Sequence, residues 1–470
     1  MSNRWKIAAA VCLFALAAGL AAAEPADATF DLADGAADIT ADGVYAIVQT
    51  GVEEGPTANG ITVAPGVAAE LVLGGVWITN ASQQAALEMA GADVTLVLEG
   101  TNTLVGGRGA AGIHVPARAE LRVCGDGALS ATGGFGAAGI GGKGNEGAGT
   151  VVFESGTVTA GSESGPGIGG GRNGGAGGIV TITGGRVTAT GNGASAGIGG
   201  GCGTGTGGAG GTVEISGGEV LAEGGSNGAG IGGANKARGG TVRISGGTVT
   251  AIGGAGGAGI GGGAGMGGNG GVFEMTGGTV TAIPGESVAG AAAVGGGSMG
   301  DGGTVSICGG SLMGTPIGVY GTNKWTVGGP DNGAAGGGVR VWAVEMPKGR
   351  YELAVTNALP YTYVYDGDGH EGSDSLWFYL PAGKYAFHKE GVPWMAQVGE
   401  DGVAKVAIAE IEIVSIDVAA DGTVSLAWTP ADYPGAVAEQ SPELGTNAVW
   451  SAFEERPGSM RLFYRIHVPE

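Results

Sequence analysis

The sequence predicts an all-β protein: a parallel β-helix of about nine coils, followed by one or two small β-sandwich domains. Three observations support this fold class. Glycine accounts for 109 of 470 residues, yet 43% of the chain is hydrophobic and only 17 residues are proline, which fits neither collagen nor a disordered chain. A glycine-rich phrase returns at the interval of one β-helix coil. Six of the eight tryptophans lie beyond these repeats, which indicates a different kind of core there.

The N-terminus has the pattern of an export signal. A positively charged start and an apolar run from Ile7 to Leu20 precede three alanines at positions 21–23, which offer a cleavage site. The apolar run is shorter than the roughly 20 residues that a membrane span needs. We therefore expect a signal peptide over residues 1–23 and an N-terminal cap over residues 24–57. The mature protein is expected to be exported to the extracellular space or cell surface, with the periplasm as the alternative.

The internal repeat is the strongest pattern in the chain. A Gly-Ile-Gly-Gly motif begins at Gly139 and returns four times up to Gly259, and a degenerate Ala-Val-Gly-Gly copy begins at Ala293. Together with upstream copies, the apolar residues of the motif form nine anchors spaced by 26 to 34 residues: Ile61, Leu87, Ile113, Ile140, Ile168, Ile198, Ile231, Ile260 and Val294. This spacing predicts β-helix coils over residues 58–320.

Each repeat also contains two strand-like segments, as in Thr-Val-Arg-Ile-Ser-Gly-Gly-Thr-Val-Thr-Ala at residues 241–251. Apolar residues alternate within the segments, which is typical of a strand with one buried face, and glycine pairs stand where the chain must bend. Three short strands and three bends complete one coil. We expect the anchors to stack as a continuous apolar ladder with a step of about 4.8 Å.

The phrase Gly-Ile-Gly-Gly…Gly-Thr-Val-x-Ile-Ser-Gly-Gly-Thr-Val-Thr-Ala resembles the glycine-rich repeats of bacterial secreted and cell-surface proteins, often labelled carbohydrate-binding. These repeats are similar to the pectate-lyase-like right-handed β-helix. The resemblance covers about 260 of the 470 residues. It implies a right-handed parallel β-helix in an exported protein that binds carbohydrate or acts as an adhesin.

The composition changes after residue 320, where short alternating segments rich in aromatic residues replace the repeats. The phrase Leu-Pro-Ala-Gly-Lys-Tyr-Ala-Phe at residues 380–387 resembles a strand and turn of prealbumin-like β-sandwiches, so a small β-sandwich is expected over residues 321–409. Residues 410–470 contain three strand-like runs and resemble a fibronectin-like β domain. This last domain would serve as a cap or attachment unit.

The charge balance excludes one class of partner. The chain has 43 acidic residues against 21 lysines and arginines, a net charge of −22, so it lacks the clustered cations that bind nucleic acid. We expect no membrane span after signal cleavage. Cys124, Cys202 and Cys308 lie too far apart for a disulfide framework or a metal knuckle, and small buried or half-buried thiols are expected.

Catalytic residues are not evident, and we expect a protein that is not an enzyme. Polysaccharide lyases and hydrolases need clustered carboxylates, whereas the Gly-Ile-Gly-Gly face offers almost no side chains. Glu214, Arg243 and Glu274 occupy equivalent positions in successive coils, which indicates a solvated salt-bridge ladder.

A second outward column consists mainly of threonines, at positions 159, 188, 250 and 281, and is interrupted by Leu221. Such a column either orders water, as in ice-binding solenoids, or is a generic outward strand surface.

A candidate site for a glycan is an aromatic stripe on a strand of the expected sandwich: Tyr361, Tyr363 and Tyr365. Exposed tyrosines could stack on sugar rings, and the alternative is that they belong to the core of the sandwich.

A candidate metal site comes directly after these tyrosines in the sequence, in an acidic loop that contains Asp366, Asp368 and Asp374. Carboxylates at alternate positions suit calcium, although the loop does not match an EF-hand. The alternative is an acidic hairpin turn without a cofactor.

Three functions fit these patterns. The first is a secreted, non-catalytic surface or matrix protein that binds a glycan or cell-surface polysaccharide. The second is a polysaccharide-active lyase or hydrolase, which would need three carboxylates in one groove, and the third is a purely structural spacer. The acidic charge favours neutral or cationic glycans over uronate chains.

Overall fold

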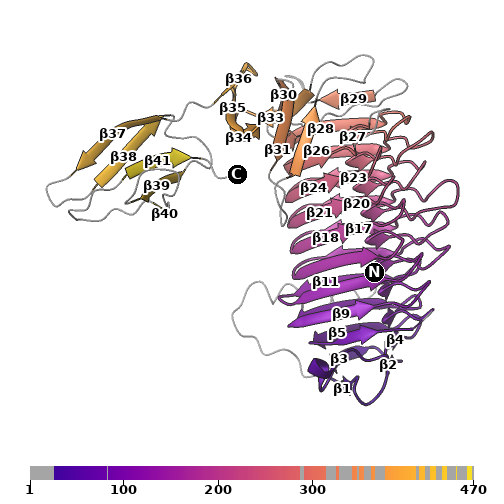
Figure 1. The fold of residues 1–470 in the computed structure, drawn as a ribbon. Coiled ribbons are helices and arrows are strands. Elements are labelled where there is room, and N and C mark those ends of the chain that lie inside the picture. Colours follow the sequence, from indigo (N-terminus) through magenta and orange to yellow (C-terminus); the bar gives the residue numbers. More distant parts are fainter. Residues whose placement is uncertain are drawn as a thin grey trace.

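The computed structural model shows an all-β protein in which a parallel β-solenoid of about nine turns is followed by antiparallel sheets (Figure 1). The predicted fold class is thereby confirmed. The structure describes residues 26–81, 83–285, 291–313, 324–327, 341–346, 349–353, 361–365, 376–408, 412–418, 424–429, 437–441, 451–452 and 463–467. The expected signal peptide lies outside these residues.

Each turn of the solenoid contributes strands to three faces. Face 1 contains β1 (Ala28–Asp31), β3 (Gly43–Val48), β5 (Ala68–Gly74), β8 (Asp93–Glu99), β11 (Glu120–Gly125), β14 (Thr150–Phe153), β17 (Ile179–Ile182), β20 (Thr212–Ile215), β23 (Thr241–Ile244) and the first halves of β26 (Val272–Ile283) and β28 (Thr304–Met313). Face 2 contains β6 (Trp77–Thr79), β9 (Thr101–Val105), β12 (Ala128–Gly133), β15 (Thr157–Ser162), β18 (Arg186–Thr190), β21 (Glu219–Glu223), β24 (Thr248–Ile252) and the second halves of β26 and β28. A short 3-10 turn, η1 (Val52–Glu54), lies before the first face-2 strand.

Face 3 is built from the glycine motifs and carries the predicted anchors. It contains β2 (Ala37–Ile39), β4 (Ile61–Val63), β7 (Leu87–Glu88), β10 (Ile113–His114), β13 (Ile140–Gly141), β16 (Ile168–Gly169), β19 (Ile198–Gly199), β22 (Ile231–Gly232), β25 (Ile260–Gly261) and β27 (Val294–Gly295). Each of the nine anchors begins a strand, and consecutive anchors form eight parallel pairs from Ile61 to Val294. In β2, Ala37 pairs with Ile61, so the segment expected as a cap already contributes parallel strands.

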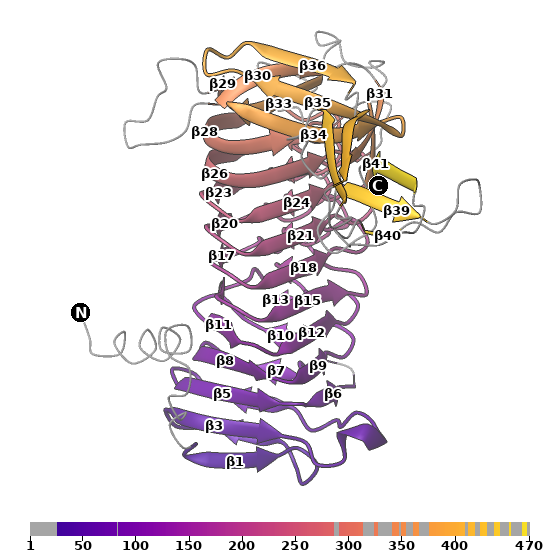
Figure 2. The ribbon, with the colours of Figure 1, turned by 90° about the vertical axis from the view of Figure 1, so that its left-hand side faces the viewer.

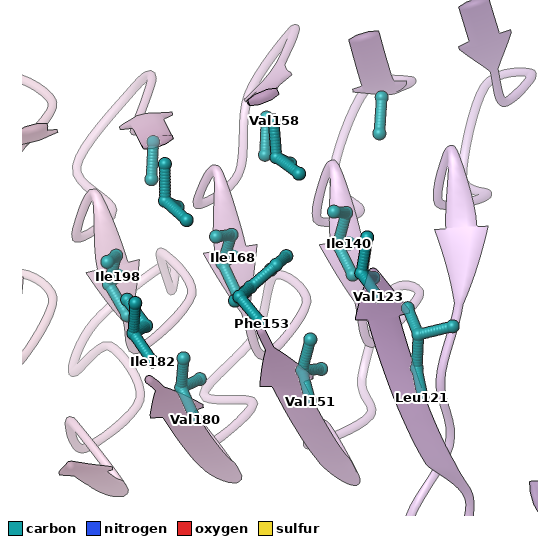
Figure 3. Close-up of a cluster of buried hydrophobic side chains, with 14 of the residues drawn as sticks. Leu121, Val123, Ile140, Val151, Phe153, Val158, Ile168, Val180, Ile182 and Ile198 are labelled. Atoms are coloured by element: carbon teal, nitrogen blue, oxygen red, sulfur yellow. The ribbon is translucent and has the colours of Figure 1, made fainter. Parts of the chain in front are cut away.

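The interior of the solenoid is a narrow apolar core. Ile140, Ile168 and Ile198 lie in line from coil to coil, opposite Val151 and Phe153 of face 1 (Figure 3). All five side chains are completely buried. The stacking follows from the parallel register, because equivalent inward positions meet at the spacing of neighbouring strands.

The three cysteines beyond residue 23 are consistent with small thiols in packed surroundings. Cys124 and Cys202 are buried, and Cys308 is half-buried.

One further parallel strand and several antiparallel strands follow the last solenoid coil. β29 (Lys324–Val327) pairs with the first half of β28 in parallel, and β33 (Leu376–Pro381) pairs with its end in antiparallel orientation and with β30 (Val341–Met346) on its other side. A five-stranded antiparallel sheet contains β31 (Gly349–Leu353), β32 (Tyr361–Tyr365), β34 (Gly383–Lys389), β35 (Val392–Val398) and β36 (Ala404–Ile408). The remaining strands are β37 (Glu412–Val418) with β38 (Val424–Thr429), and β39 (Val437–Ser441) with β40 (Ser451–Ala452) and β41 (Phe463–His467).

A second apolar cluster joins the antiparallel strands to the solenoid. Leu221, Ile252 and Ile283 occupy outward positions of face 2 in successive coils, and all three are buried. They form one cluster with side chains of β30, β33, β34 and β35, among them Phe378 and Leu380. Figure 2 shows these strands gathered at the C-terminal end of the solenoid.

Candidate functional site

The glycine motif does not form an open binding face. The glycine that follows each anchor from Gly141 to Gly295 is buried and has a φ between 135° and 141°. A Cβ at Gly169 would lie only 1.9 Å from the carbonyl oxygen of Gly199 in the next coil. The backbone N–H of Ala196 donates to the carbonyl of Gly200 at 3.0 Å and closes the turn around the motif. These glycines are therefore required by backbone packing.

The charged column on face 1 is the salt-bridge ladder that the sequence predicts. Glu214, Arg243 and Glu274 are direct neighbours on adjacent strands. The Nε of Arg243 lies 2.8 Å from Oε2 of Glu274, and its Nη1 lies 3.4 Å from Oε1 of Glu214. The hydrogen bond to Glu274 raises the pKa of the guanidinium. The ladder lines a small groove of about 300 Å³, in which both carboxylates are already engaged by the same arginine.

The threonine column is not a free, flat array. Thr159 is exposed, but Thr250 is only 1% exposed and Thr281 only 7%. Leu221 of the same column belongs to the apolar cluster under the antiparallel strands. The C-terminal half of the column is thus covered, which contradicts a water-ordering surface along its whole length.

A buried histidine forms a cluster that the sequence interpretation missed. His114 is 3% exposed and lies between two carboxylates: its Nδ1 contacts Oε1 of Glu88, and its Nε2 lies 2.9 Å from Oε2 of Glu146. Both ring nitrogens can donate together only in the protonated imidazole. Lys143 adds a contact of 3.9 Å to Glu146. Burial opposes ionisation of Glu88, but the hydrogen bond and charge of His114 and the charge of Lys143 outweigh it and lower the pKa of that carboxyl.

The signal for this cluster was present in the repeat itself. Glu88 and His114 each follow an anchor, and the anchors Leu87 and Ile113 pair directly. Consecutive anchors therefore place the two side chains on neighbouring rungs. Glu146 could not be assigned in this way, because it comes from a turn and not from a strand.

The larger groove of the described residues crosses the turns that follow face 3 in the C-terminal coils. It measures about 810 Å³ and is lined by polar side chains from successive turns and by glycine backbone. The side chains that could bind a ligand are exposed: Thr206, Lys236, Arg238, Asn269 and Asp301. They provide a hydroxyl, two cations, an amide and a carboxylate within one open groove.

Hydrogen bonds between neighbouring turns hold this groove in shape. The N–H of Gly207 donates to the carbonyl of Asn235 at 2.8 Å, and the N–H of Gly239 donates to the carbonyl of Asn269 at 2.8 Å. The N–H of Asp301 donates to Oδ1 of Asn269 at 3.0 Å. Each turn is thus fixed by the next, and the polar side chains project from a preformed backbone.

The tyrosines of the expected glycan platform lie in β32, whose backbone pairs with β31. Their side chains are outside the described part of the structure, so the platform stays a prediction. The acidic loop with Asp366, Asp368 and Asp374 also lies outside the described residues, and the calcium site stays a prediction.

The described residues contain no group of three or more His, Cys, Asp or Glu side chains placed to hold a metal ion. Over the same residues, we find no helix with the length and apolar character needed to cross a membrane.

Fold and site together define a parallel β-solenoid with a polar groove across the turns of its C-terminal coils. Comparison of the chain with protein-family models, curated proteins and solved structures finds no match.

Proposed function

We propose that the protein is an exported, non-catalytic surface or matrix protein that binds a glycan in the polar groove. One observation carries the proposal: donors and acceptors from several coils line a single open groove of about 810 Å³. A sugar hydroxyl both donates and accepts hydrogen bonds, and the Asn269 amide and Thr206 hydroxyl can do the same. Lys236 and Arg238 add donors, and Asp301 adds acceptors.

The rigidity of the turns supports binding. A ligand that enters a preformed site loses less free energy to the ordering of side chains and loops. The turns of this groove are joined by backbone hydrogen bonds, so only the ends of the side chains remain to be ordered. The groove also runs across successive coils, which suits an extended chain of sugars.

The arrangement of carboxylates favours binding over cleavage. Glycoside hydrolysis uses a pair of carboxyl groups, and proton abstraction needs a positioned base. Of the described residues that line the larger groove, Asp301 is the one carboxylate. In the smaller groove Glu214 and Glu274 both pair with the same arginine, Arg243, so both carboxylates are already engaged.

The repeat pattern supports the proposal that the protein acts at the cell surface or in the matrix. It resembles the glycine-rich repeats of bacterial cell-surface proteins with a pectate-lyase-like right-handed β-helix, and the N-terminus has the pattern of an export signal. A solenoid presents its turns as an extended surface, which is how repeat proteins commonly bind partners.

A glycan-array screen of residues 24–470 tests the proposal. The unmodified chain should bind at least one glycan, and Arg238→Ser combined with Asp301→Ala should lower that binding about tenfold or more, because two direct contacts are lost. The matched control is Arg186→Ser combined with Glu219→Ala on face 2, which also removes one cation and one anion. Unchanged binding by the groove variant, or absence of binding by the folded unmodified chain, would contradict the proposal.

A further inference from the structure

A second cluster, outside the polar groove, combines two arginines with one exposed aromatic ring. The Arg108 Cζ lies 5.3 Å from the centre of the Phe135 ring, and the Arg172 Cζ lies 4.9 Å from the same centre. The Phe135 side chain is 39% exposed. Phe135 is one of three aromatic residues between positions 101 and 310. We call Arg108, Phe135 and Arg172 the arginine cluster.

The backbone fixes the three members of the arginine cluster relative to one another. They come from three separate turns, between β9 and β10, between β12 and β13, and between β16 and β17. The N–H of Gly109 donates to the carbonyl of Phe135 at 3.2 Å, and the N–H of Arg172 donates to the carbonyl of Gly136 at 2.8 Å. The two guanidinium groups are therefore held near one ring by the fold.

The charge pattern of the solenoid sets these two arginines apart. Arg122, Arg186 and Arg243 on faces 1 and 2 are each paired with one or two glutamates. Within the described residues, no ion pair links Arg108 or Arg172 to a carboxylate, in a chain that carries 43 acidic residues.

One glutamate close to Arg172, Glu146, pairs with other side chains. The carbonyl of Glu146 accepts a hydrogen bond from the N–H of Gly171, next to Arg172, at 2.8 Å. Its carboxylate is nevertheless engaged by His114 and Lys143. Two like charges thus share one ring without an internal counterion among the described groups, so a bound anion would relieve their repulsion.

The chemistry of a guanidinium placed over an aromatic ring identifies the ligand class. An aromatic ring accepts no proton-sharing pair of the kind that a carboxylate does, so N–H groups of the guanidinium remain available to bind an oxyanion with two parallel hydrogen bonds. Arg172 belongs to the same kind of turn, after face 3, as the turns that line the polar groove, the first of which carries Thr206 one coil further on. One coil corresponds to about 4.8 Å, so a polymer lying in the groove can extend to the cluster.

We propose that the arginine cluster binds an oxyanion, a carboxylate or a sulfate ester, of an acidic polysaccharide. The proposal rests on the proposed function in that it takes the ligand to be a glycan, but it concerns a different site. It also revises the expectation from net charge that neutral or cationic glycans are favoured, because the local charge of these turns is positive.

The test uses residues 24–470 and four probes: a sulfated glycosaminoglycan, polygalacturonate, neutral dextran and double-stranded DNA. We expect the unmodified chain to bind at least one acidic polysaccharide at low ionic strength more tightly than dextran or DNA. Arg108→Gln combined with Arg172→Gln should weaken that binding about tenfold or more, since two charge-assisted contacts are lost. The control, Arg118→Gln combined with Arg186→Gln, changes the net charge equally and should bind as the unmodified chain does.

A charge-preserving variant separates the geometry from simple attraction. Arg108→Lys combined with Arg172→Lys keeps both charges but loses the planar donor edge, and it should remain weaker than the unmodified chain. Full affinity in the lysine variant, equal loss in the control, or tighter binding of DNA through the same arginines would overturn the proposal, as would no acidic polysaccharide bound at all. Melting curves of all variants establish that they are folded.

The outcomes for the two proposed sites are distinguishable. If the glutamine variant loses acidic polysaccharide but keeps the glycan that depends on Arg238 and Asp301, both proposals hold. If binding depends on the arginine cluster alone, the groove proposal fails and the cluster stands. If binding depends on the groove alone, the arginine-cluster proposal fails and the groove proposal stands.

Discussion

The glycine column of face 3 allows a quantitative prediction. Gly199 has a φ of 139°, and a Cβ at this position would lie 2.1 Å from the carbonyl oxygen of Gly232 in the next coil. Gly199→Ala therefore combines backbone strain of about 1–2 kcal/mol with overpacking of about 1–3 kcal/mol. We expect the free energy of unfolding to fall by about 2–5 kcal/mol, and the melting temperature to fall by on the order of 10 °C.

Alanine substitutions at three other glycines measure backbone strain and overpacking separately. Gly75 has a φ of 76° with nothing within 4 Å of a built Cβ, so Gly75→Ala tests strain alone, about 1 kcal/mol. Gly201 has no positive φ, but its Cβ would lie 2.1 Å from the carbonyl oxygen of Gly171, so Gly201→Ala tests crowding alone. Gly205 has neither feature, and Gly205→Ala should be neutral or stabilising by about 0.4–1 kcal/mol.

Urea titration followed by circular dichroism gives the four free energies on the same chain. We expect Gly199→Ala to be the least stable variant, Gly75→Ala and Gly201→Ala to be intermediate, and Gly205→Ala to be the most stable. If Gly199→Ala were as stable as Gly205→Ala, the column would not be required by packing, and the repeat of the motif would need another explanation.

Two further predictions concern the apolar cluster and the buried histidine. Ile283→Ala should destabilise the protein by about 2–4 kcal/mol because this side chain is 1% exposed, whereas Ile179→Ala, at 47% exposed, should change stability by less than about 0.5 kcal/mol; equal urea midpoints would contradict the docking of the antiparallel strands on face 2. The fold lowers the pKa of the Glu88 carboxyl. The ionised carboxyl therefore adds to the free energy of unfolding above the ordinary carboxyl pKa, and this stabilisation is lost as the pH falls through the lowered pKa. Glu88→Gln should thus be less stable than the unmodified chain at pH 7, and the difference in stability should shrink as the pH falls below the ordinary carboxyl pKa. A difference in urea midpoint that did not change with pH would refute the role of this ion pair.

The register of the solenoid could be predicted because one constraint repeats in every coil. An inward anchor must meet the anchor of the next coil, as Ile140 meets Ile168, and the inward residues of the Thr-Val-x-Ile phrase must meet in the same way, as Val213 meets Val242. The same alignment places Glu214 beside Arg243, which is why the salt-bridge ladder was found from spacing alone.

The polar groove could not be predicted in the same way. Its turns differ in length, and their shape depends on hydrogen bonds to neighbouring turns; Lys236 has a φ of 57°, which nothing in its own sequence requires. The arginine cluster likewise joins residues whose spacings do not match the repeat. For the apolar cluster, the equivalent outward positions of Ile252 and Ile283 signal a buried patch, but they do not identify the strands that cover it.

The covering of β28 has a consequence for how the solenoid ends. Strands paired in parallel present the same edge after every coil, and a bare edge of backbone N–H and C=O groups is a template for fibril growth. Here the first half of β28 is occupied by β29, and its end is occupied by β33, which runs in the opposite direction. A reversed strand cannot continue the register of the coils, so on face 2 it blocks the pairing of a further coil, whether from the same chain or from a second copy. Truncation before residue 324 would expose this edge and is expected to turn a rod of fixed length into one that polymerises.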